Sequence, residues 1–343
     1  MLKKIHCYQL VLTLLLSGCA SQPIEHNEVT NNSSLPVLPQ VLPESQPQPL
    51  LNNSFPEPSH PYYADTISGD FGQSIELHQF IDKMVTKHGF SSTYLNGLFS
   101  QAQRLEQVIN LESPAPYQGP SKPRLGSWTR YRNKFLTAEH IKHGVEFWRN
   151  NAQAVQLASQ TYGVDPEYIV AIIGVETYFG RNIGKTKIID ALSTLAFATH
   201  RRAKYFSSEL EHYLLMTREQ HYEPRQPVGS WAGAMGLGQF MPSSFRKLAV
   251  DFDHNGRCDI WQPTDAIGSV AHYFAKHGWQ RQRPVTQPSR PSNNESVIEL
   301  STYQGSEFWQ IHPNFKVIKR YNNSNKYAMA VHQLAQAIKQ RYL

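Results

Sequence analysis

Apolar residues recur every three or four positions over much of the chain, which is the spacing of one face of an α-helix. The pattern is clearest over residues 141–155, where Thr137 can cap the start of a helix and Gly163 can end it. It predicts one continuous helix there. Three further sets share the spacing: Phe206, Leu210, Tyr213 and Leu214; Ile267, Val270, Ala271 and Phe274; and Tyr327, Val331, Leu334 and Ile338. Strand patterns are few, the best being residues 296–300 and 315–318, so we expect a mainly α fold.

A chain of 343 residues with 40% hydrophobic content can bury a large core, as one large domain or two smaller ones. Charged residues make up 17% and aromatic residues 11%, which excludes a disordered chain and suits ligands that stack on rings. The net charge is +6, from 33 basic and 27 acidic residues, without a run of five basic ones. A dedicated nucleic-acid-binding protein is therefore not expected, whereas an anionic polymer or membrane surface suits the mild positive charge.

The N-terminal end has the organisation of a secretory signal. Lys3 and Lys4 precede an apolar stretch far shorter than the roughly 20 residues needed to cross a bilayer. The stretch ends in Leu-Ser-Gly-Cys and resembles a bacterial lipobox, in which the signal is cut before a cysteine that is then lipidated. We expect residues 1–18 to be a lipoprotein signal peptide and Cys19 to carry lipid, the alternative being an ordinary signal peptide. By the same resemblance Ala20, where Asp could stand, favours the outer membrane.

A proline-rich segment separates this end from the rest of the chain. Nine of the 22 prolines lie between residues 22 and 65, which is typical of an extended tether. The expected organisation is a lipidated N-terminus and tether over residues 19–68 and a folded region over residues 69–343. Cys7 leaves with the signal, so Cys258 stands alone and a disulfide framework is excluded.

One carboxyl group lies on an apolar helix face. Asp165 and Pro166 predict a helix start, with a capping residue followed by proline at the first helical position. Three isoleucines and then Glu176 follow at positions i, i+3, i+4 and i+7 of one face. Burial and a helix C-terminus both raise the pKa of a carboxyl group, and these conditions suit a general acid. The alternative is a Glu at a helix end that turns to water or pairs with Arg181.

Two glycine-rich segments follow Glu176. Residues 180–186 are similar to a phosphate-binding loop, but three residues instead of four separate the glycines. An exported protein would also meet no nucleoside triphosphate, so we set this alternative aside. Residues 229–242 are rich in small residues, and Ser230 and Gln239 there offer neutral hydrogen-bonding groups to a ligand.

Residues 251–259 match the first half of an EF-hand calcium loop. Asp251, Asp253 and Asn255 occupy positions 1, 3 and 5, and a glycine occupies position 6. Position 12 is Gln instead of Glu, and Asp265, three residues later, can close a longer loop. We expect Ca²⁺ here, the alternative being a polar turn before the next helix.

Four blocks of the sequence are distinctive in combination: GVETYFGRNIGKTKIIDALSTLAF, SWAGAMGLGQFMPSSF, AVDFDHNGRCDIWQPTDAIGSVAHYFAKHGW and RYNNSNKYAMAVHQL. Together they resemble the lytic murein transglycosylase B family, membrane-bound enzymes that cleave peptidoglycan. The resemblance runs from about residue 70 to residue 343. It implies a lysozyme-like α+β catalytic core with flanking α-rich regions, an EF-hand-like loop over residues 251–265, and no organic cofactor.

The resemblance also implies the residues of the site, with Glu176 as the sole catalytic acid and base. The active-site positions of the family correspond to Tyr131, Tyr205, Ser230, Gln239, Phe240, Tyr273, Tyr321, Asn322 and Tyr327. Its calcium ligands correspond to Asp251, Asp253, Asn255, the Arg257 carbonyl and Asp265. The segment between Trp279 and Arg320 is shorter than in fuller members, so we expect an accessory substrate-contacting module to be trimmed there.

Such an enzyme uses one carboxyl group where ordinary glycosidases use two. Glu176 would protonate the β-1,4 glycosidic oxygen between N-acetylmuramic acid and N-acetylglucosamine. Its carboxylate would then take the proton of the muramoyl 6-hydroxyl, which attacks C1 and leaves a 1,6-anhydro end without consuming water. The expected partners are peptidoglycan strands, the periplasmic face of the outer membrane through the lipid, and cell-wall synthesis proteins. Two alternatives stay open: a goose-type lysozyme-like hydrolase of the same bond, and an inactive glycan-binding lipoprotein.

Overall fold

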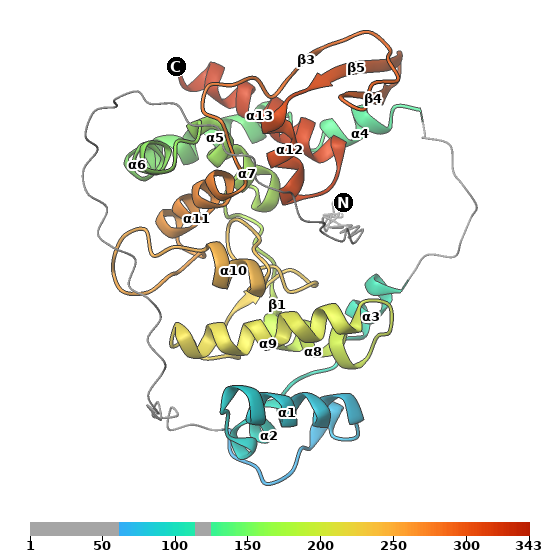
Figure 1. Ribbon diagram of the computed structural model, residues 1–343, viewed down its shortest axis with the longest axis vertical. Helices are drawn as coiled ribbons and strands as arrows, with labels where there is room; N and C mark the ends of the chain where they lie inside the picture. The colour runs from blue at the N-terminus through green and yellow to red at the C-terminus, as the bar shows by residue number, and fades with distance from the viewer. Residues whose placement is uncertain (1–61, 114–124) are drawn as a thin grey trace, which may run out of the picture. The chain divides into compact units, whose positions relative to one another are not determined.

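The computed structural model describes residues 62–113 and 125–343 (Figure 1). The expected signal peptide, the lipid-bearing Cys19 and most of the tether therefore lie outside the described residues. Within the described ranges, none of the helices combines the length and the apolar character that a membrane span requires.

The described chain is mainly helical, as expected. Its helices are the 3-10 helix η1 (Gly69–Phe71) and α1 (Ile75–His88), α2 (Ser92–Ser100), α3 (Glu106–Glu112), α4 (Ser127–Arg132), α5 (Ala138–Asn150), α6 (Ala152–Tyr162), α7 (Pro166–Thr177), α8 (Ile188–Phe197), α9 (Ala203–Glu219), α10 (Pro242–Leu248), α11 (Pro263–Lys276), α12 (Pro313–Tyr321) and α13 (Asn325–Tyr342). Its strands are β1 (Thr186–Lys187), β2 (Val228–Gly229), β3 (Thr286–Pro288), β4 (Val297–Thr302) and β5 (Gly305–Ile311).

Helix α7 is the central element of the region that holds the site. Helices α5, α6, α11 and α13 all pack against it (Figure 1), so every residue from Glu167 to Thr177 is buried. A helix covered on all sides is apolar around its whole circumference, which explains the run of Ile, Val and Ala. The helix begins after Asp165 as expected, but this carboxylate does not cap it. Its oxygens instead accept hydrogen bonds from the indole nitrogen of Trp279 at 2.9 Å and the backbone nitrogen of Gln282 at 3.1 Å.

The helix expected over residues 141–155 is divided in two. Thr137 caps its start, because its side chain accepts a 3.1 Å hydrogen bond from the backbone nitrogen of His140, and Gly163 ends it with a φ of 64°. Between these ends, Asn151 leaves the helical conformation and separates α5 from α6. Its side-chain amide donates to the Phe147 carbonyl at 2.8 Å, and its backbone nitrogen donates to the same carbonyl at 3.1 Å, so both groups bond to the last turn of α5. The prediction of one continuous helix is therefore wrong.

A second set of helices follows α7 along the chain. Helices α8 and α9 pack on each other, α3 packs on α8, and α10 packs on α9. Strands β1 and β2 pair antiparallel, with Thr186 opposite Gly229. This pairing joins the segment after α7 to the start of the glycine-rich turn.

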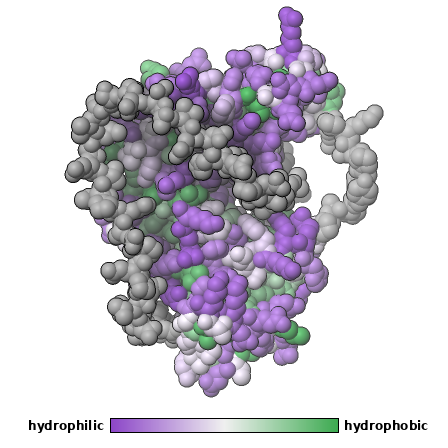
Figure 2. Space-filling view, viewed as in Figure 1, coloured by the Kyte–Doolittle hydropathy of each residue, from purple (hydrophilic) through white to green (hydrophobic). Residues whose placement is uncertain are grey.

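A small antiparallel sheet has the order β3–β5–β4. The strand predicted at residues 296–300 is confirmed as β4. The strand predicted at residues 315–318 is wrong, because that segment lies in α12, where Pro313 occupies the first turn and Phe315 and Ile318 face the core one turn apart. Hydrophilic residues cover most of the face seen in Figure 2, and apolar residues appear there as small separate areas.

Candidate active site

Glu176 lies in the last turn of α7 and is 9% exposed. The phenol of Tyr327, on α13, donates a hydrogen bond to its Oε1 at 2.5 Å. These two residues come from the first and the last of the four sequence blocks. The packing of α13 on α7 therefore completes the surroundings of the carboxyl group.

Burial is the main influence on the ionisation of Glu176. It raises the pKa of the carboxyl group from 4.5 to about 7, against the opposing effect of the Tyr327 hydrogen bond. Pairing with Arg181, the alternative reading of the sequence, is wrong, since the Arg181 guanidinium lies 3.8 Å from Glu146. A carboxyl group with this pKa can give up or accept a proton near neutral pH.

Aromatic side chains from four elements gather around Glu176. Burial, together with the negative charge of Glu176, raises the pKa of Tyr131 on α4 and of Tyr273 on α11 to about 12. Tyr321, at the end of α12, donates to the Gly238 carbonyl at 2.7 Å, and its ring centroid lies 4.6 Å from that of Tyr273. The ring of Phe240 lies 6.0 Å from both. Together with Tyr327, five predicted residues thus lie in the surroundings of the carboxyl group.

The glycine-rich turn holds Ser230 and Gln239 through its own backbone. The Ser230 hydroxyl accepts from the Ala234 nitrogen at 3.0 Å, and the Gln239 amide donates to the Gly236 carbonyl at 2.9 Å. Gly236 has a φ of 66°, and a Cβ there would lie 2.4 Å from the Ile260 carbonyl oxygen. The turn therefore requires glycine at this position, and it fixes the orientation of both polar side chains.

Tyr205 and Asn322, like Ser230 and Gln239, have their contacts in the described chain with residues other than Glu176. Tyr205 lies on α9, where burial and the nearby Glu209 raise the pKa of its phenol. Asn322 follows α12, and its carbonyl accepts from the Ser324 nitrogen at 2.7 Å. Their part in binding remains a prediction.

Thr177 is a site residue that sequence reasoning missed. It is fully buried, and its hydroxyl donates to the Leu237 carbonyl at 2.9 Å and accepts from the Gly180 nitrogen at 3.1 Å. Between Thr177 and Gly180 the chain turns sharply, with left-handed φ values of 53° at Tyr178 and 59° at Phe179. Thr177 thus joins the end of α7 to the glycine-rich turn. Glycine at 180 was the one signal of this turn, because bulky residues in left-handed conformation are not recognisable from sequence.

Three of the predicted metal ligands form a cluster that could bind a metal ion. Carboxylate oxygens of Asp251, Asp253 and Asp265 lie within 4.8 Å of one another. Asp265 is 1% exposed and accepts hydrogen bonds from the backbone nitrogens of Phe252 at 2.7 Å and Asp259 at 2.6 Å. Asp265 is buried and held in place, whereas Asp253 is exposed. Such a set of hard oxygen donors fits a calcium ion.

The other two predicted ligands lie in the exposed part of the same loop. Asn255 accepts from the Arg257 nitrogen at 3.0 Å, which keeps the loop tightly turned. The side chain of Arg257 is turned to Tyr222, with the guanidinium 3.9 Å from the centre of the ring. Metal binding by the backbone carbonyl of Arg257 remains a prediction. The loop also contacts the site, because the Leu237 nitrogen donates to the Ile260 carbonyl at 2.9 Å.

Comparisons with known proteins agree with this geometry. The family model described as the transglycosylase SLT domain matches residues 72–297 and 285–336. Membrane-bound lytic murein transglycosylase B of Escherichia coli K12 is 42% identical over 373 residues, covering 98% of each chain. The structure of the E. coli lytic transglycosylase Slt35 in complex with calcium has a TM-score of 0.74 and 44% identity, covering 81% of this chain and 96% of that one. SltB3 of Pseudomonas aeruginosa in complex with NAG-anhNAM-pentapeptide has a TM-score of 0.67 and 26% identity, covering 78% and 80%.

Proposed function

The chain belongs to the membrane-bound lytic murein transglycosylase B family, with a lysozyme-like fold, and is a lytic transglycosylase acting on peptidoglycan; we propose that Glu176 is its single catalytic acid and base. The observation that carries this proposal is the buried carboxyl group with a pKa of about 7, bonded to Tyr327. Burial, opposed by this hydrogen bond, accounts for the raised pKa of Glu176. The distinctive sequence blocks supply one candidate acid for this site, which supports a mechanism with one carboxyl group instead of two.

In the first step the protonated Glu176 donates its proton to the glycosidic oxygen between N-acetylmuramic acid and N-acetylglucosamine. The bond from C1 of the muramoyl residue to this oxygen breaks, and positive charge develops at C1. The N-acetyl group of the same sugar stabilises that charge. Burial prepares this step, because the raised pKa keeps Glu176 protonated near neutral pH and its proton is available to the leaving oxygen.

In the second step the Glu176 carboxylate accepts the proton of the muramoyl 6-hydroxyl. The hydroxyl oxygen attacks C1, which closes the 1,6-anhydro ring and returns Glu176 to its protonated form. Tyr327 donates a hydrogen bond to the carboxylate between the two steps, when the group is charged. Water is not consumed, so the products carry anhydro ends instead of reducing ends.

The aromatic and polar side chains around Glu176 are suited to hold sugars. The partly exposed rings of Tyr131 and Tyr273 offer faces on which pyranose rings can stack, and the buried ring of Phe240 packs beside Tyr273. Ser230 and Gln239 have fixed orientations and can bond to N-acetyl and hydroxyl groups. We assign Tyr205, Tyr321 and Asn322 to the same binding site by family resemblance.

We also propose that the cluster of three aspartates, with Asn255 and the Arg257 carbonyl, binds Ca²⁺. An ion there would stabilise the loop that bonds to Leu237 and precedes the helix with Tyr273. Its role would be structural, since the reaction above needs no metal at Glu176. The relative Slt35 binds calcium, which supports the same ion here.

The lipobox leads us to propose a lipid anchor at Cys19, a tether over residues 19–68, and a place on the periplasmic face of the outer membrane. The E. coli relative is a membrane-bound protein by its name, which supports this arrangement. Cys19→Ser should move the protein from the membrane to the soluble fraction. A variant that still sediments with membranes would contradict the anchor.

Analysis of the released products tests the catalytic proposal. Purified protein lacking the first 18 residues should release muropeptides with 1,6-anhydro ends, which mass spectrometry separates from hydrolysed ends by the mass of one water. Glu176→Gln should release none.

A further inference from the structure

His140 of α5 is a buried histidine to which the reaction above assigns no part. It is 7% exposed, and its Nε2 lies 3.0 Å from the Gly174 carbonyl oxygen. A carbonyl oxygen accepts and does not donate, so this nitrogen carries the hydrogen and the tautomer of the ring is fixed. Burial lowers the pKa of the ring to about 4. His140 is therefore a neutral hydrogen-bond donor near pH 7.

The Gly174 carbonyl belongs to the last turn of the catalytic helix. It also accepts from the Tyr178 backbone nitrogen at 3.0 Å, so one oxygen joins α5, the end of α7 and the residue that follows it. The last carbonyl groups of a helix take partners from outside its regular turns. Glu176 lies midway between Gly174 and Tyr178 in the chain. A shift of this carbonyl group would therefore move the backbone of Glu176.

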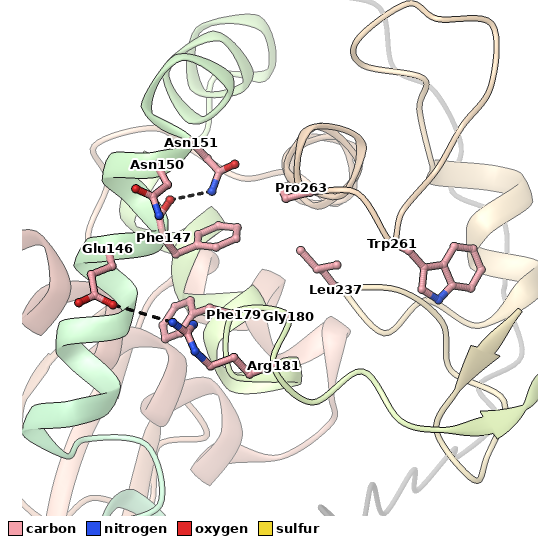
Figure 3. A pocket seen from close by; sticks show the side chains of 10 residues that line it. All are labelled: Glu146, Phe147, Asn150, Asn151, Phe179, Gly180, Arg181, Leu237, Trp261 and Pro263. Atoms are coloured by element: carbon pink, nitrogen blue, oxygen red, sulfur yellow. Dashed lines mark hydrogen bonds and ion pairs between the residues drawn. The ribbon is translucent and has the colours of Figure 1, made fainter.

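The ring of Phe179, in the turn after the catalytic helix, lies between α5 and α7. It is so close to both helices that a Cβ on Gly144 would lie 2.9 Å from it and a Cβ on Gly174 would lie 2.5 Å from it. The centroid of the His140 ring lies 5.3 Å from that of Phe179. Phe179 also lines a pocket of about 490 Å³ beside α5 (Figure 3). Because this side of the turn borders open space, packing alone does not fix the turn, and hydrogen bonds contribute to its position.

His140 can act on Glu176 through the backbone and not through charge. The ring is neutral, and the pKa of Glu176 reflects burial and the Tyr327 hydrogen bond. The side chains proposed to stack on sugars lie on other elements, Tyr131 on α4 and Tyr273 on α11. Loss of the bond from His140 should therefore disturb the acid more than the binding of substrate.

We propose that His140 is a positioning residue of the reaction, whose Nε2–H bond holds the last turn of α7 where Glu176 meets the phenol of Tyr327. The proposal rests on the catalytic role proposed for Glu176 and adds a buried residue that acts through it. A simpler role would be packing alone, with the His140 ring filling space beside Phe179. The two roles differ in the part of the side chain that matters, which is the N–H donor in the first and the ring in the second.

Two variants separate the donor from the ring. His140→Gln keeps an N–H donor at nearly the position of Nε2 and loses the ring, whereas His140→Phe keeps a ring and loses the donor. If the bond positions Glu176, His140→Phe should lower kcat roughly five- to tenfold, the effect of one neutral hydrogen bond, and leave KM within about twofold of the parent value. His140→Gln should retain more than about half of the parent kcat. A kcat in His140→Phe equal to or higher than that in His140→Gln would overturn the proposal.

The pH profile of kcat gives a second readout, which a role in packing alone would not move. In His140→Phe the carboxyl group of Glu176 should lose part of its bond to Tyr327, a bond that lowers the pKa of the group. That pKa should then rise, and the alkaline limb of the profile should move to higher pH. His140→Leu, which has a smaller side chain without a donor, is measured beside it and carries the same prediction. A lower kcat with the limb in its parent position in both variants would contradict the proposal.

His78→Phe is the matched control for a ring nitrogen bonded to a backbone carbonyl. His78 is exposed on α1, where its Nδ1 lies 2.7 Å from the Ser74 carbonyl oxygen. Its replacement should change neither kcat nor the pH profile. Glu176→Gln in the same assay separates this proposal from the catalytic one. Cleavage by Glu176→Gln at the parent rate would contradict the assignment of the acid, whereas an inactive Glu176→Gln beside a fully active His140→Phe would contradict only the role of His140.

Discussion

The phenol of Tyr327 donates a 2.5 Å hydrogen bond to the carboxyl group of Glu176, across the contact between α13 and α7. Two opposing effects meet at this bond. Burial disfavours the carboxylate and raises the pKa, whereas the hydrogen bond favours the carboxylate and lowers it. Their balance gives a pKa of about 7, which allows one group to act as acid and then as base.

Tyr327→Phe removes the effect that lowers the pKa of Glu176 and leaves burial in place. The pKa of the carboxyl group should therefore rise above about 7, and the fall of kcat at alkaline pH should move upward by about one pH unit. A pH profile of kcat over pH 4–10 measures this. Tyr342→Phe, whose ring stacks on Trp148, is the control and should leave the profile unchanged. An alkaline limb that moves to lower pH in Tyr327→Phe would contradict this account of the bond.

Glu176→Gln should stabilise the protein at alkaline pH. The folded pKa of about 7 lies above the ordinary 4.5, so the folded state binds the proton more tightly than the unfolded state. The stabilisation from that proton is complete below pH 4.5 and is lost as pH rises through 7. The difference corresponds to about 3 kcal/mol, which a neutral amide does not lose.

Urea unfolding of the parent and Glu176→Gln proteins at pH 4 and pH 8 tests this linkage. The variant should gain stability relative to the parent at pH 8 and show little difference at pH 4. Glu106→Gln, at a side chain that is 68% exposed, should change little at either pH. Equal stability differences at the two pH values for Glu176→Gln would show that ionisation of Glu176 is not coupled to folding.

Thr177→Val should lower kcat and leave KM nearly unchanged. Valine has the shape of threonine but cannot bond to the Leu237 carbonyl or accept from the Gly180 nitrogen. Two buried backbone groups would lose a partner, at a cost of about 1–3 kcal/mol each at most. Thr177→Ser keeps the hydroxyl and should retain most of the rate. If serine and valine reduce kcat equally, the hydroxyl does not position the end of α7.

Removal of divalent metal should destabilise the protein and leave the reaction intact at low temperature. An ion that binds the folded state alone adds roughly 2.7 kcal/mol at about 100 times its dissociation constant. A chelator should lower the Tm, and Ca²⁺ should restore it better than Mg²⁺, which demands a tight octahedron. Asp251→Ala should remove this response. Loss of turnover without any change of the Tm would show instead that the metal is catalytic.

Local patterns predicted the acid but not all of its surroundings. The helical spacing of three isoleucines and Glu176 placed the carboxyl group on an apolar face, and α7 confirms it. Its partner Tyr327 is 151 residues away, and periodicity cannot pair two distant helices. The resemblance to a family supplied that residue. Nothing in the sequence pointed to Thr177.

The errors in the fold have related causes. Asn151 interrupts a helix whose apolar spacing continues across it: its backbone leaves the helical conformation, and its side chain bonds back to the Phe147 carbonyl at the end of α5. Phe315, Val317 and Ile318 are aromatic or β-branched, but Pro313 starts a helix there and packing against α13 decides the outcome. Asp165 has the identity of a helix cap, yet the nearby indole of Trp279 takes its carboxylate. In each case a contact overrides a local preference.

The most direct test of the catalytic proposal compares the products of the parent and Glu176→Gln proteins on purified peptidoglycan. The parent should release muropeptides with 1,6-anhydro ends and without detectable reducing ends. The variant should keep its fold and its binding to the polymer, and should lose more than the roughly 10²–10⁴-fold that general acid catalysis alone contributes, because one group serves both steps. A variant that retains more than about a tenth of the parent rate would contradict the assignment of Glu176 as the single acid and base, because that loss is far below the expected range. A parent enzyme that releases reducing ends would contradict its action as a lytic transglycosylase.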